Sequence, residues 1–145
     1  MQIRKARLAD ARILYKLAGN MEEMTGSSEI NGYTPEEIKS WLKKKDKVWL
    51  VAETLKGRKK EISGFLLAMF LSDEWCVIDS VEVKKEYRRK GIGTLLFKNL
   101  AKICKNKKIG YLQTLVDIKN KPARKFWKNM GFQDGKTFIW LDQVF

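Results

Sequence analysis

Apolar residues recur along this 145-residue chain with two spacings, and a change of spacing marks where an element begins. Residues 2–7 alternate between apolar and polar, which predicts a first strand, whereas apolar residues over 8–24 recur at helical spacing. A second helix is expected to begin near Thr34, because Thr34 can cap it, Pro35 suits its first position and Glu37 completes a capping box.

The middle of the chain holds three long apolar runs separated by charged or turn-forming segments. Residues 48–54, 62–71 and 75–83 are predicted to be strands joined as antiparallel hairpins. The second run is apolar on both faces, which is typical of a strand in the centre of a sheet. Gly64 inside that run indicates a β-bulge or the close approach of a neighbouring backbone.

The last third of the chain alternates between strand and helix patterns. Helical spacing predicts helices over 92–105 and 120–130, and strands are expected at 111–116 and 136–141. The whole order is β-α-α-β-β-β-α-β-α-β. It predicts the α/β (α+β) fold class, with a mixed sheet covered by helices.

One stretch, residues 83–96, combines a strand end, a basic loop with two glycines and a helix start. The first N–H groups of a helix lack internal partners and carry partial positive charge, so they can hold a phosphate or pyrophosphate. Gly91 and Gly93 let the backbone come close to such a ligand. Full charges are added by Arg88, Arg89 and Lys90. A dinucleotide fingerprint or a P-loop is disfavoured, because Leu96 holds the third glycine position and the Gly-Lys-Ser/Thr triplet is absent.

The composition excludes several kinds of active site. The chain has no histidine and two cysteines, so neither a Cys/His zinc site nor a histidine-dependent triad can be built from it, and no metal is expected. Cys76 and Cys104 lie in apolar surroundings and are expected to be reduced core thiols. The length and the 44% of hydrophobic residues predict one globular domain, residues 1–145.

The formal net charge of +13 could serve nucleic acid, an anionic membrane or an acidic ligand. The basic residues are spread over every segment, so a solvated surface is favoured over nucleic-acid binding. No apolar run approaches the roughly 20 residues of a membrane span. Residues 1–5 lack a signal-peptide core. We therefore expect a cytoplasmic protein without a membrane partner.

Two motifs carry a resemblance to a known family. Residues 88–93 resemble the Arg/Gln-x-x-Gly-x-Gly/Ala loop of the GNAT superfamily of N-acetyltransferases, and residues 81–83 precede the loop as that family's fourth strand does. Residues 120–132 are similar to the family's Asn-x-x-Ala-x-x-Phe-Tyr-x-x-x-Gly-Phe helix. The resemblance covers essentially the whole chain. It implies a mixed, mostly antiparallel sheet of six to seven strands flanked by helices.

The resemblance implies that acetyl-CoA binds between the fourth and fifth strands, which splay apart. The pantetheine arm is expected to pair with backbone groups of Val81 and Val83 like an added strand, and Asn120 is expected to reach the pantetheine region. The residues implied for the pyrophosphate are Arg88, Arg89, Lys90, Gly91, Ile92, Gly93 and Thr94.

The implied reaction is direct attack of a primary amine on acetyl-CoA in a ternary complex. An amine with a pKa of about 10.4 must first lose a proton. Asp79 and Glu82 are the acidic residues on the strand before the loop, and strand alternation predicts that they point to opposite faces. Asp79, deeper in the strand, is the favoured base, with a structural hydrogen bond or charge pair as the competing interpretation. Glu82 is second and Glu53 is a weaker candidate, and a water chain to bulk solvent could replace any of them.

Trp127 departs from the family pattern, in which many members place a tyrosine as general acid for the leaving thiolate. An indole N–H donates a hydrogen bond but is not an acid near neutral pH. The thiolate then leaves with help from solvent or from CoA itself, or Tyr111 or another group replaces the tyrosine, or activity is low.

The acceptor is expected to be a primary amine on a small molecule or a protein. Its pocket is expected to involve the N-terminal helices and the loop at 25–32, where Glu22, Glu23 and Glu29 could attract an amine, although solvated charges are favoured. Two other functions stay open. One is a non-catalytic acyl-CoA-binding or regulatory domain, which Trp127 favours, and the other is a nucleic-acid-binding protein. A homodimer is also left open.

Overall fold

A computed structural model of the chain describes residues 1–18, 33–139, 141 and 143. These residues fall into two compact units, Met1–Leu115 and Val116–Phe145, and each is described by itself. The loop expected at 25–32, with the three acidic residues near it, lies outside the described residues. In the described ranges, no helix is long and apolar enough to cross a membrane.

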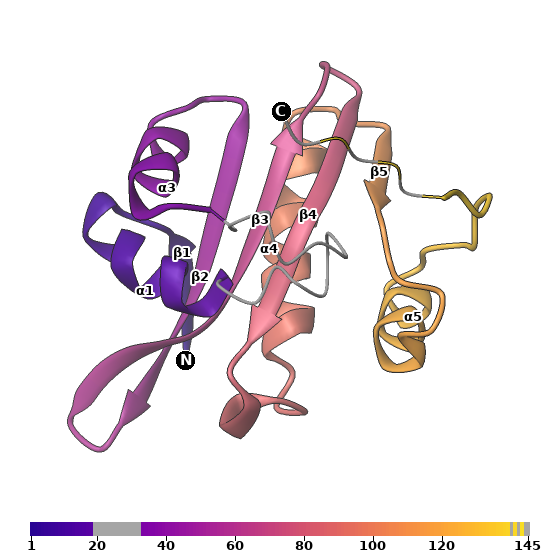
Figure 1. The fold of residues 1–145 in the computed structure, drawn as a ribbon. Helices are drawn as coiled ribbons and strands as arrows, with labels where there is room; N and C mark the ends of the chain where they lie inside the picture. Colours follow the sequence, from indigo (N-terminus) through magenta and orange to yellow (C-terminus); the bar gives the residue numbers. More distant parts are fainter. Residues whose placement is uncertain (19–32, 140, 142, 144–145) are drawn as a thin grey trace. The chain divides into compact units, whose positions relative to one another are not determined.

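In its described residues, the first unit is a five-stranded sheet with helices on both faces (Figure 1). The strands follow the order β1-β2-β3-β4-β5, and all neighbours are antiparallel except β4 and β5, which are parallel. The strands are β1 Gln2–Lys5, β2 Lys47–Lys56, β3 Lys59–Phe70, β4 Trp75–Val83 and β5 Tyr111–Thr114. The helices are α1 Ala11–Ala18, α3 Pro35–Leu42 and α4 Ile92–Asn106, with short 3-10 helices η1 Leu8–Asp10 and η2 Lys85–Tyr87.

This arrangement confirms the predicted fold class and the predicted element order up to the last strand. The described sheet has five strands instead of six or seven. The difference lies at 136–141, where the described residues form no strand and Phe138 and Ile139 are 76% and 87% exposed. An apolar pattern favours a strand, but a strand forms only where its backbone N–H and C=O groups find a partner.

Two apolar layers enclose the sheet of the first unit. On one face, side chains of β2 and β3 pack against α1 and α3; this cluster contains Leu14, Ile38, Trp49, Val51, Phe65 and Leu67. The opposite face is covered by α4, which contacts β2, β3 and β4 and buries Leu96, Leu100 and Cys104 (Figure 1). Residues 62–68 of β3 are all buried, which confirms that β3 is a central strand. Cys76 and Cys104 are free and buried, as predicted.

Helix α3 begins where the capping motif predicts. Thr34 Oγ1 accepts a hydrogen bond from the Glu37 N–H at 3.2 Å, and the Thr34 N–H donates to the Glu37 carboxylate at 2.7 Å. Pro35 is the first residue of the helix. Because this reciprocal cap defines the first turn, it also fixes the position of Tyr33, which directly precedes the cap.

Strand β3 contains a β-bulge beside Gly64. Ala52 pairs with Gly64 and Glu53 pairs with Ile62, so Ser63 is the extra residue. A Cβ atom on Gly64 would lie 2.6 Å from the backbone oxygen of Glu82 on β4, which is closer than a side chain allows. Both predicted reasons for a glycine are therefore present: a bulge and a close backbone approach.

The second unit contains one described helix, α5 Lys121–Asn129. Asn120 caps the first turn of α5, since its Oδ1 accepts a backbone N–H at 3.1 Å. At the other end, the Phe132 N–H donates to the Trp127 carbonyl at 3.0 Å across Gly131, which has a φ of 92°. The Trp127 and Phe132 rings pack edge to face, with centroids 5.0 Å apart. The roles toward a ligand that the resemblance implies for Asn120 and Trp127 stay predictions.

Candidate functional site

Strand β4 has two halves along the edge that faces β5. In the paired half, residues 75–78, β4 forms a parallel ladder with residues 111–114 of β5. In the open half, residues 79–83, no described strand pairs with β4 on that side. The pairing with β5 ends at Ile78, whose carbonyl accepts a hydrogen bond from the Thr114 hydroxyl at 3.0 Å. Figure 1 shows β5 beside one end of β4 only.

The open half directs backbone groups toward the unpaired side. The Lys84 N–H donates to the Ser63 carbonyl on β3 at 2.9 Å. Because N–H groups of successive strand residues point to opposite edges, those of Val83 and Val81 point away from β3. The Val83 carbonyl already accepts a hydrogen bond from Arg88 Nε at 2.9 Å. The groups directed to the unpaired side are thus both backbone groups of Val81 and the N–H of Val83.

The loop after β4 has the backbone of an anion site. Arg89 and Gly91 have φ values of 60° and 76°, in the left-handed region, and α4 begins at Ile92. The first helical hydrogen bond runs from the Leu95 N–H to the Gly91 carbonyl at 3.0 Å, so the three N–H groups before it have no intrahelical acceptor. Such turns gather N–H groups around an anion. That the anion is a pyrophosphate stays a prediction.

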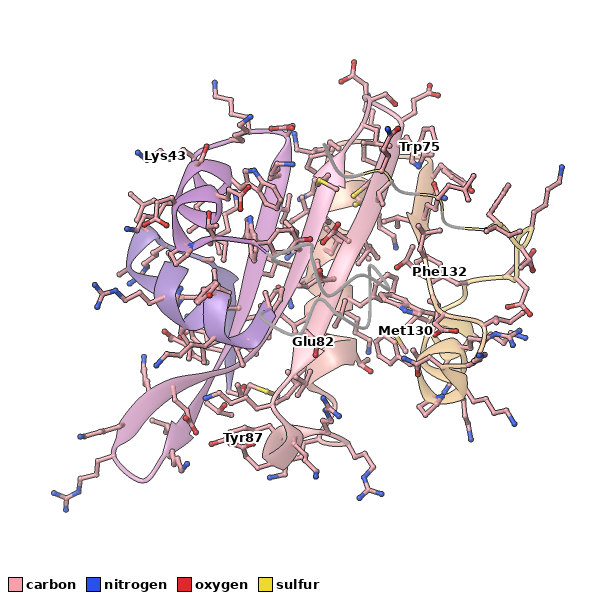
Figure 2. All side chains as sticks on the ribbon, in the orientation of Figure 1. Lys43, Trp75, Glu82, Tyr87, Met130 and Phe132 are labelled. Carbon is pink, nitrogen blue, oxygen red and sulfur yellow. The ribbon has the colours of Figure 1, made fainter. Side chains whose placement is uncertain are left out.

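Three residues that the sequence analysis did not single out, Tyr87, Lys84 and Glu61, hold this loop against β3. Tyr87 donates its hydroxyl to the Glu61 carboxylate, and Lys84 Nζ lies 3.0 Å from the same carboxylate. The hydrogen bond raises the pKa of Tyr87 to about 12 and lowers the pKa of Glu61. In Figure 2, Tyr87 and Glu82 mark the loop end of β4, and Trp75 marks its other end. Glu61 carries no sequence signal, because it lies 26 residues before Tyr87.

A β-bulge decides where the acidic side chains of β4 point. Leu67 pairs with Ser80 and Ala68 pairs with Ile78, so Asp79 is the extra residue on β4. An extra residue shifts the alternation of side chains by one position. The prediction of opposite faces assumed an unbroken alternation, and that assumption fails at Asp79.

Asp79 and Glu82 therefore lie on the same face of the sheet, and the prediction of opposite faces is wrong. Glu82 is directly opposite Phe65, whose side chain belongs to the cluster that packs on α1 and α3. Asp79 accepts a hydrogen bond from Tyr33, which packs against the same cluster. The α1/α3 face thus carries both candidate bases.

Two hydroxyl groups converge on one oxygen of Asp79. Tyr33 donates to Oδ2 at 2.5 Å and Ser80 donates to Oδ2 at 2.7 Å. Burial and, after it, the hydrogen bond to Asp79 raise the pKa of Tyr33 far above its usual value. The structural hydrogen bond that competes with a catalytic role is therefore present. It engages Oδ2, and no described residue donates to Oδ1.

Two weaker candidates lie away from the open half. Glu53 Oε1 is 2.6 Å from Arg4 Nη2, an ion pair that ties β2 to β1. Tyr111 is the first residue of β5, and its ring packs edge to face on Trp75. It lies three residues, or about 10 Å, before Thr114, the last β5 residue that pairs with β4. Within the described ranges, no group of three or more His, Cys, Asp or Glu residues is placed to hold a metal ion.

Comparison with families and curated proteins gives two matches. The family model described as "Acetyltransferase (GNAT) family" matches residues 15–132. A Bacillus subtilis (strain 168) protein, named "Putative [ribosomal protein bS18]-alanine N-acetyltransferase", is 33% identical over 66 residues. That alignment covers 42% of this chain and 44% of the B. subtilis protein, so the chain matches less than half of this relative.

Solved structures share the fold at lower identity. PaiA N-acetyltransferase from Thermoplasma acidophilum, in complex with coenzyme A, has a TM-score of 0.70 at 23% identity, covering 94% of this chain and 92% of that chain. An aminoglycoside acetyltransferase from an uncultured soil metagenomic sample, in complex with sisomicin, has a TM-score of 0.74 at 17% identity, covering 99% and 95%. At these identities the similarity concerns the fold.

Proposed function

Because the chain belongs to the GNAT family of acetyltransferases, we propose that it transfers the acetyl group of acetyl-CoA to a primary amine in a ternary complex. The observation that carries the proposal is the open half of β4 followed, after the short helix η2, by the anion loop of residues 88–94. An acyl-CoA needs both, because it joins an amide-containing arm to a pyrophosphate. We also propose that residues 1–145 act as one N-acetyltransferase domain, since the matched family model runs from the first unit into the second.

The open half of β4 is the proposed place of the pantetheine arm. An extended ligand can add to an unpaired strand edge through backbone hydrogen bonds. Val81 offers both of its backbone groups on that side, and Val83 offers its N–H. The Val83 carbonyl is not among the proposed partners, because Arg88 already donates to it.

The anion loop is the proposed place of the pyrophosphate. The helix start supplies N–H groups, and the loop supplies three cations; the proposed residues are Arg88, Arg89, Lys90, Gly91, Ile92, Gly93 and Thr94. The contact of Tyr87 with Glu61 supports this role, because it holds the loop to β3. A pre-ordered loop costs less to organise on binding.

Acetyl-CoA supplies the acetyl group as a thioester, and the residues of the chain orient it and manage the proton of the amine. Asp79 is the proposed base, because its Oδ1 receives no hydrogen bond from a described residue and can take a proton from the acceptor. Glu82, on the same face, is the second candidate. A backbone N–H of Val81 or Val83 is the proposed donor to the thioester oxygen.

The proposal assigns no acid to the leaving thiolate. Trp127 cannot act as one near neutral pH, and the hydroxyl-bearing alternative, Tyr111, lies about 10 Å from the end of the β4–β5 ladder. Solvent is therefore the proposed source of that proton. Trp127 also favours the second candidate function, an acyl-CoA-binding domain without turnover.

The proposed acceptors follow from the two relatives with named substrates. One is the amino group of an alanine on a protein, and the other is an amine of an aminoglycoside such as sisomicin. Both are primary amines that carry a proton at neutral pH, and a carboxylate at the site suits both.

Thiol release tests the proposal. The full chain is incubated with acetyl-CoA and, in separate reactions, an alanine-initiated peptide, sisomicin and a polyamine, and free thiol is followed with a colorimetric reagent. We expect release that depends on one class of amine. Calorimetric binding of CoA without release on any amine would instead support the acyl-CoA-binding domain. Salt-dependent binding to RNA or duplex DNA that excess CoA does not compete away would support a nucleic-acid-binding protein.

A further inference from the structure

We propose that Tyr33 is a positioning residue: together with Ser80 it clamps Oδ2 of Asp79, so that Oδ1 is presented to the ammonium group of the acceptor. This inference rests on the proposed function of the open half of β4. It assigns a role to a residue outside both family motifs, directly before the cap of α3.

The clamp is inferred because two hydrogen bonds end on the same oxygen of Asp79. The hydroxyls of Tyr33 and Ser80 both donate to Oδ2, at 2.5 Å and 2.7 Å. The terminal torsion of an aspartate is broad, so a free carboxylate rotates and exchanges its two oxygens readily. Two donors on one oxygen stop this rotation. Oδ1 is then held in one direction.

Asp10 shows what a purely structural aspartate does in the same unit. Arg4 donates to both of its oxygens, to Oδ2 at 2.7 Å and to Oδ1 at 3.0 Å, and the Arg7 N–H donates to Oδ2 at 2.6 Å. Both oxygens are therefore engaged. Asp79 differs, because its described donors are gathered on one oxygen.

Tyr33 is itself held firmly enough to position a partner. Its ring packs edge to face on Trp41, with centroids 4.7 Å apart. The next residue, Thr34, makes the reciprocal cap with Glu37 that starts α3. A tyrosine has only two side-chain torsions, so a fixed backbone and a packed ring fix the hydroxyl as well.

The clamp lies at the boundary between the paired half and the open half of β4. Asp79 is the bulged residue, and it directly follows Ile78, the last β4 residue that pairs with β5. Bulges are frequent next to active sites because they redirect a side chain. Here the bulge places the neighbouring residues Asp79 and Ser80 on the same α1/α3 face, because Ser80 lies opposite Leu67 of that cluster, and Tyr33 reaches Asp79 from that face.

Steady-state kinetics of Tyr33→Phe test the proposal with the amine found by thiol release. The substitution keeps the ring and its contact with Trp41 and removes only the hydroxyl. We expect kcat to fall about 10-fold, as for loss of one hydrogen bond to a charged group, with the KM for acetyl-CoA unchanged. Ser72→Ala is the matched control, because it also removes one hydroxyl group, which accepts a hydrogen bond from the Glu74 N–H at 3.2 Å in the exposed turn between β3 and β4, and it should leave kcat unchanged.

A double-mutant cycle separates positioning from support of the fold. If Tyr33 acts through Asp79, Tyr33→Phe should cause no further loss of kcat in an Asp79→Asn background. A kcat for Tyr33→Phe within twofold of the wild type overturns the proposal. An undiminished effect in the Asp79→Asn background overturns it as well.

A crystal structure of Tyr33→Phe gives a readout that does not depend on turnover. We expect the Asp79 carboxylate to rotate or to occupy two orientations, and an unchanged single orientation overturns the clamp. Absence of turnover in the wild type on every amine would contradict the proposed function, and the same crystal structure would still decide whether Tyr33 orients Asp79.

Discussion

The two halves of β4 belong to one continuous strand and have different chemistry. The paired half is bonded to strands on both edges, and its residues Cys76 and Ile78 are almost completely buried. The open half is bonded to β3 alone among the described strands, and it carries the polar residues Asp79, Ser80 and Glu82. The candidate site therefore arises where β5 pairing stops.

Strand β3 keeps the open half of β4 in place. Gly64 lets the backbone of β3 approach the open half closely, and the Lys84 N–H bonds to Ser63 beyond it. The anion loop is fixed to β3 by Tyr87 and Glu61. The open half is thus supported from β3, which leaves its other edge for a ligand.

Of the substitutions that test the difference between the two halves, Asp79→Asn is expected to have the largest effect, on kcat. If the open half holds the base, kcat should fall about 100-fold or more, which is the contribution typical of general base catalysis. The affinity for CoA, measured by calorimetry, should stay within twofold, because Asp79 is not among the residues proposed to hold CoA. Asp73→Asn, in the exposed turn beside the paired half, is the matched control. Equal activity of the two variants would remove Asp79 from the role of base.

Charge reversal in the anion loop should give the next largest effect. We expect the Arg88→Glu/Arg89→Glu variant to bind CoA about 10- to 100-fold more weakly, because two attractive charges become repulsive beside a pyrophosphate. The melting temperature should hardly change, since both side chains are on the surface loop. Lys98→Glu/Lys102→Glu on the exposed side of α4 makes the same change of charge elsewhere. A similar CoA affinity for both double variants would contradict the loop as the anchor.

Substitution of Gly64 should show that the open half depends on β3. In Gly64→Ala the new Cβ meets the Glu82 carbonyl at 2.6 Å, so β3 and β4 must move apart. We expect the free energy of unfolding to fall by about 1–3 kcal/mol in urea denaturation, the usual cost of overpacking. Gly110→Ala is the control, since no atom lies within 4 Å of its added Cβ. Equal stability of the two variants would mean that the close approach is not needed.

The pH dependence of stability should give the smallest effect. The raised pKa of Tyr87 means that its contact with Glu61 stabilises fully below the ordinary tyrosine pKa of about 10 and is lost as pH rises through about 12. The lowered pKa of Glu61 means that the same contact is complete above the ordinary glutamate value and is lost as pH falls through the lowered one. Tyr87→Phe should remove the tyrosine part of this dependence in urea midpoints measured across pH. Identical pH profiles for the variant and the wild type would contradict a stabilising contact.

Local patterns predicted much of the fold. The start of α3, the central position of β3 and the need for a glycine at position 64 all follow from neighbouring residues, and the structure confirms them. The family resemblance, carried by two short motifs, is confirmed by the family model. These features depend on capping, hydrophobic spacing and backbone freedom, which act over a few residues.

Other features needed the tertiary structure. The placement of Asp79 and Glu82 on opposite faces was wrong, because a bulge is a property of the pairing of two strands and not of one strand's sequence. Tyr33 was missed because it meets Asp79 across 46 residues of sequence. The strand expected at 136–141 depended on finding a partner strand, and hydrophobic pattern alone does not supply one.

By itself, the sequence determined the element order up to the last strand, the basic, glycine-containing loop after β4 and the family to which the chain belongs. Only the tertiary structure decided that β4 loses its β5 partner at Asp79, that a bulge places Asp79 and Ser80 on the same face of the sheet, and that the hydroxyls of Tyr33 and Ser80 both donate to one oxygen of Asp79. The physical reason is the separation along the chain of the residues that interact. Turns, caps and periodicity are set by neighbours along the chain, whereas strand register and the direction of a carboxylate are set by residues that meet only in the folded protein.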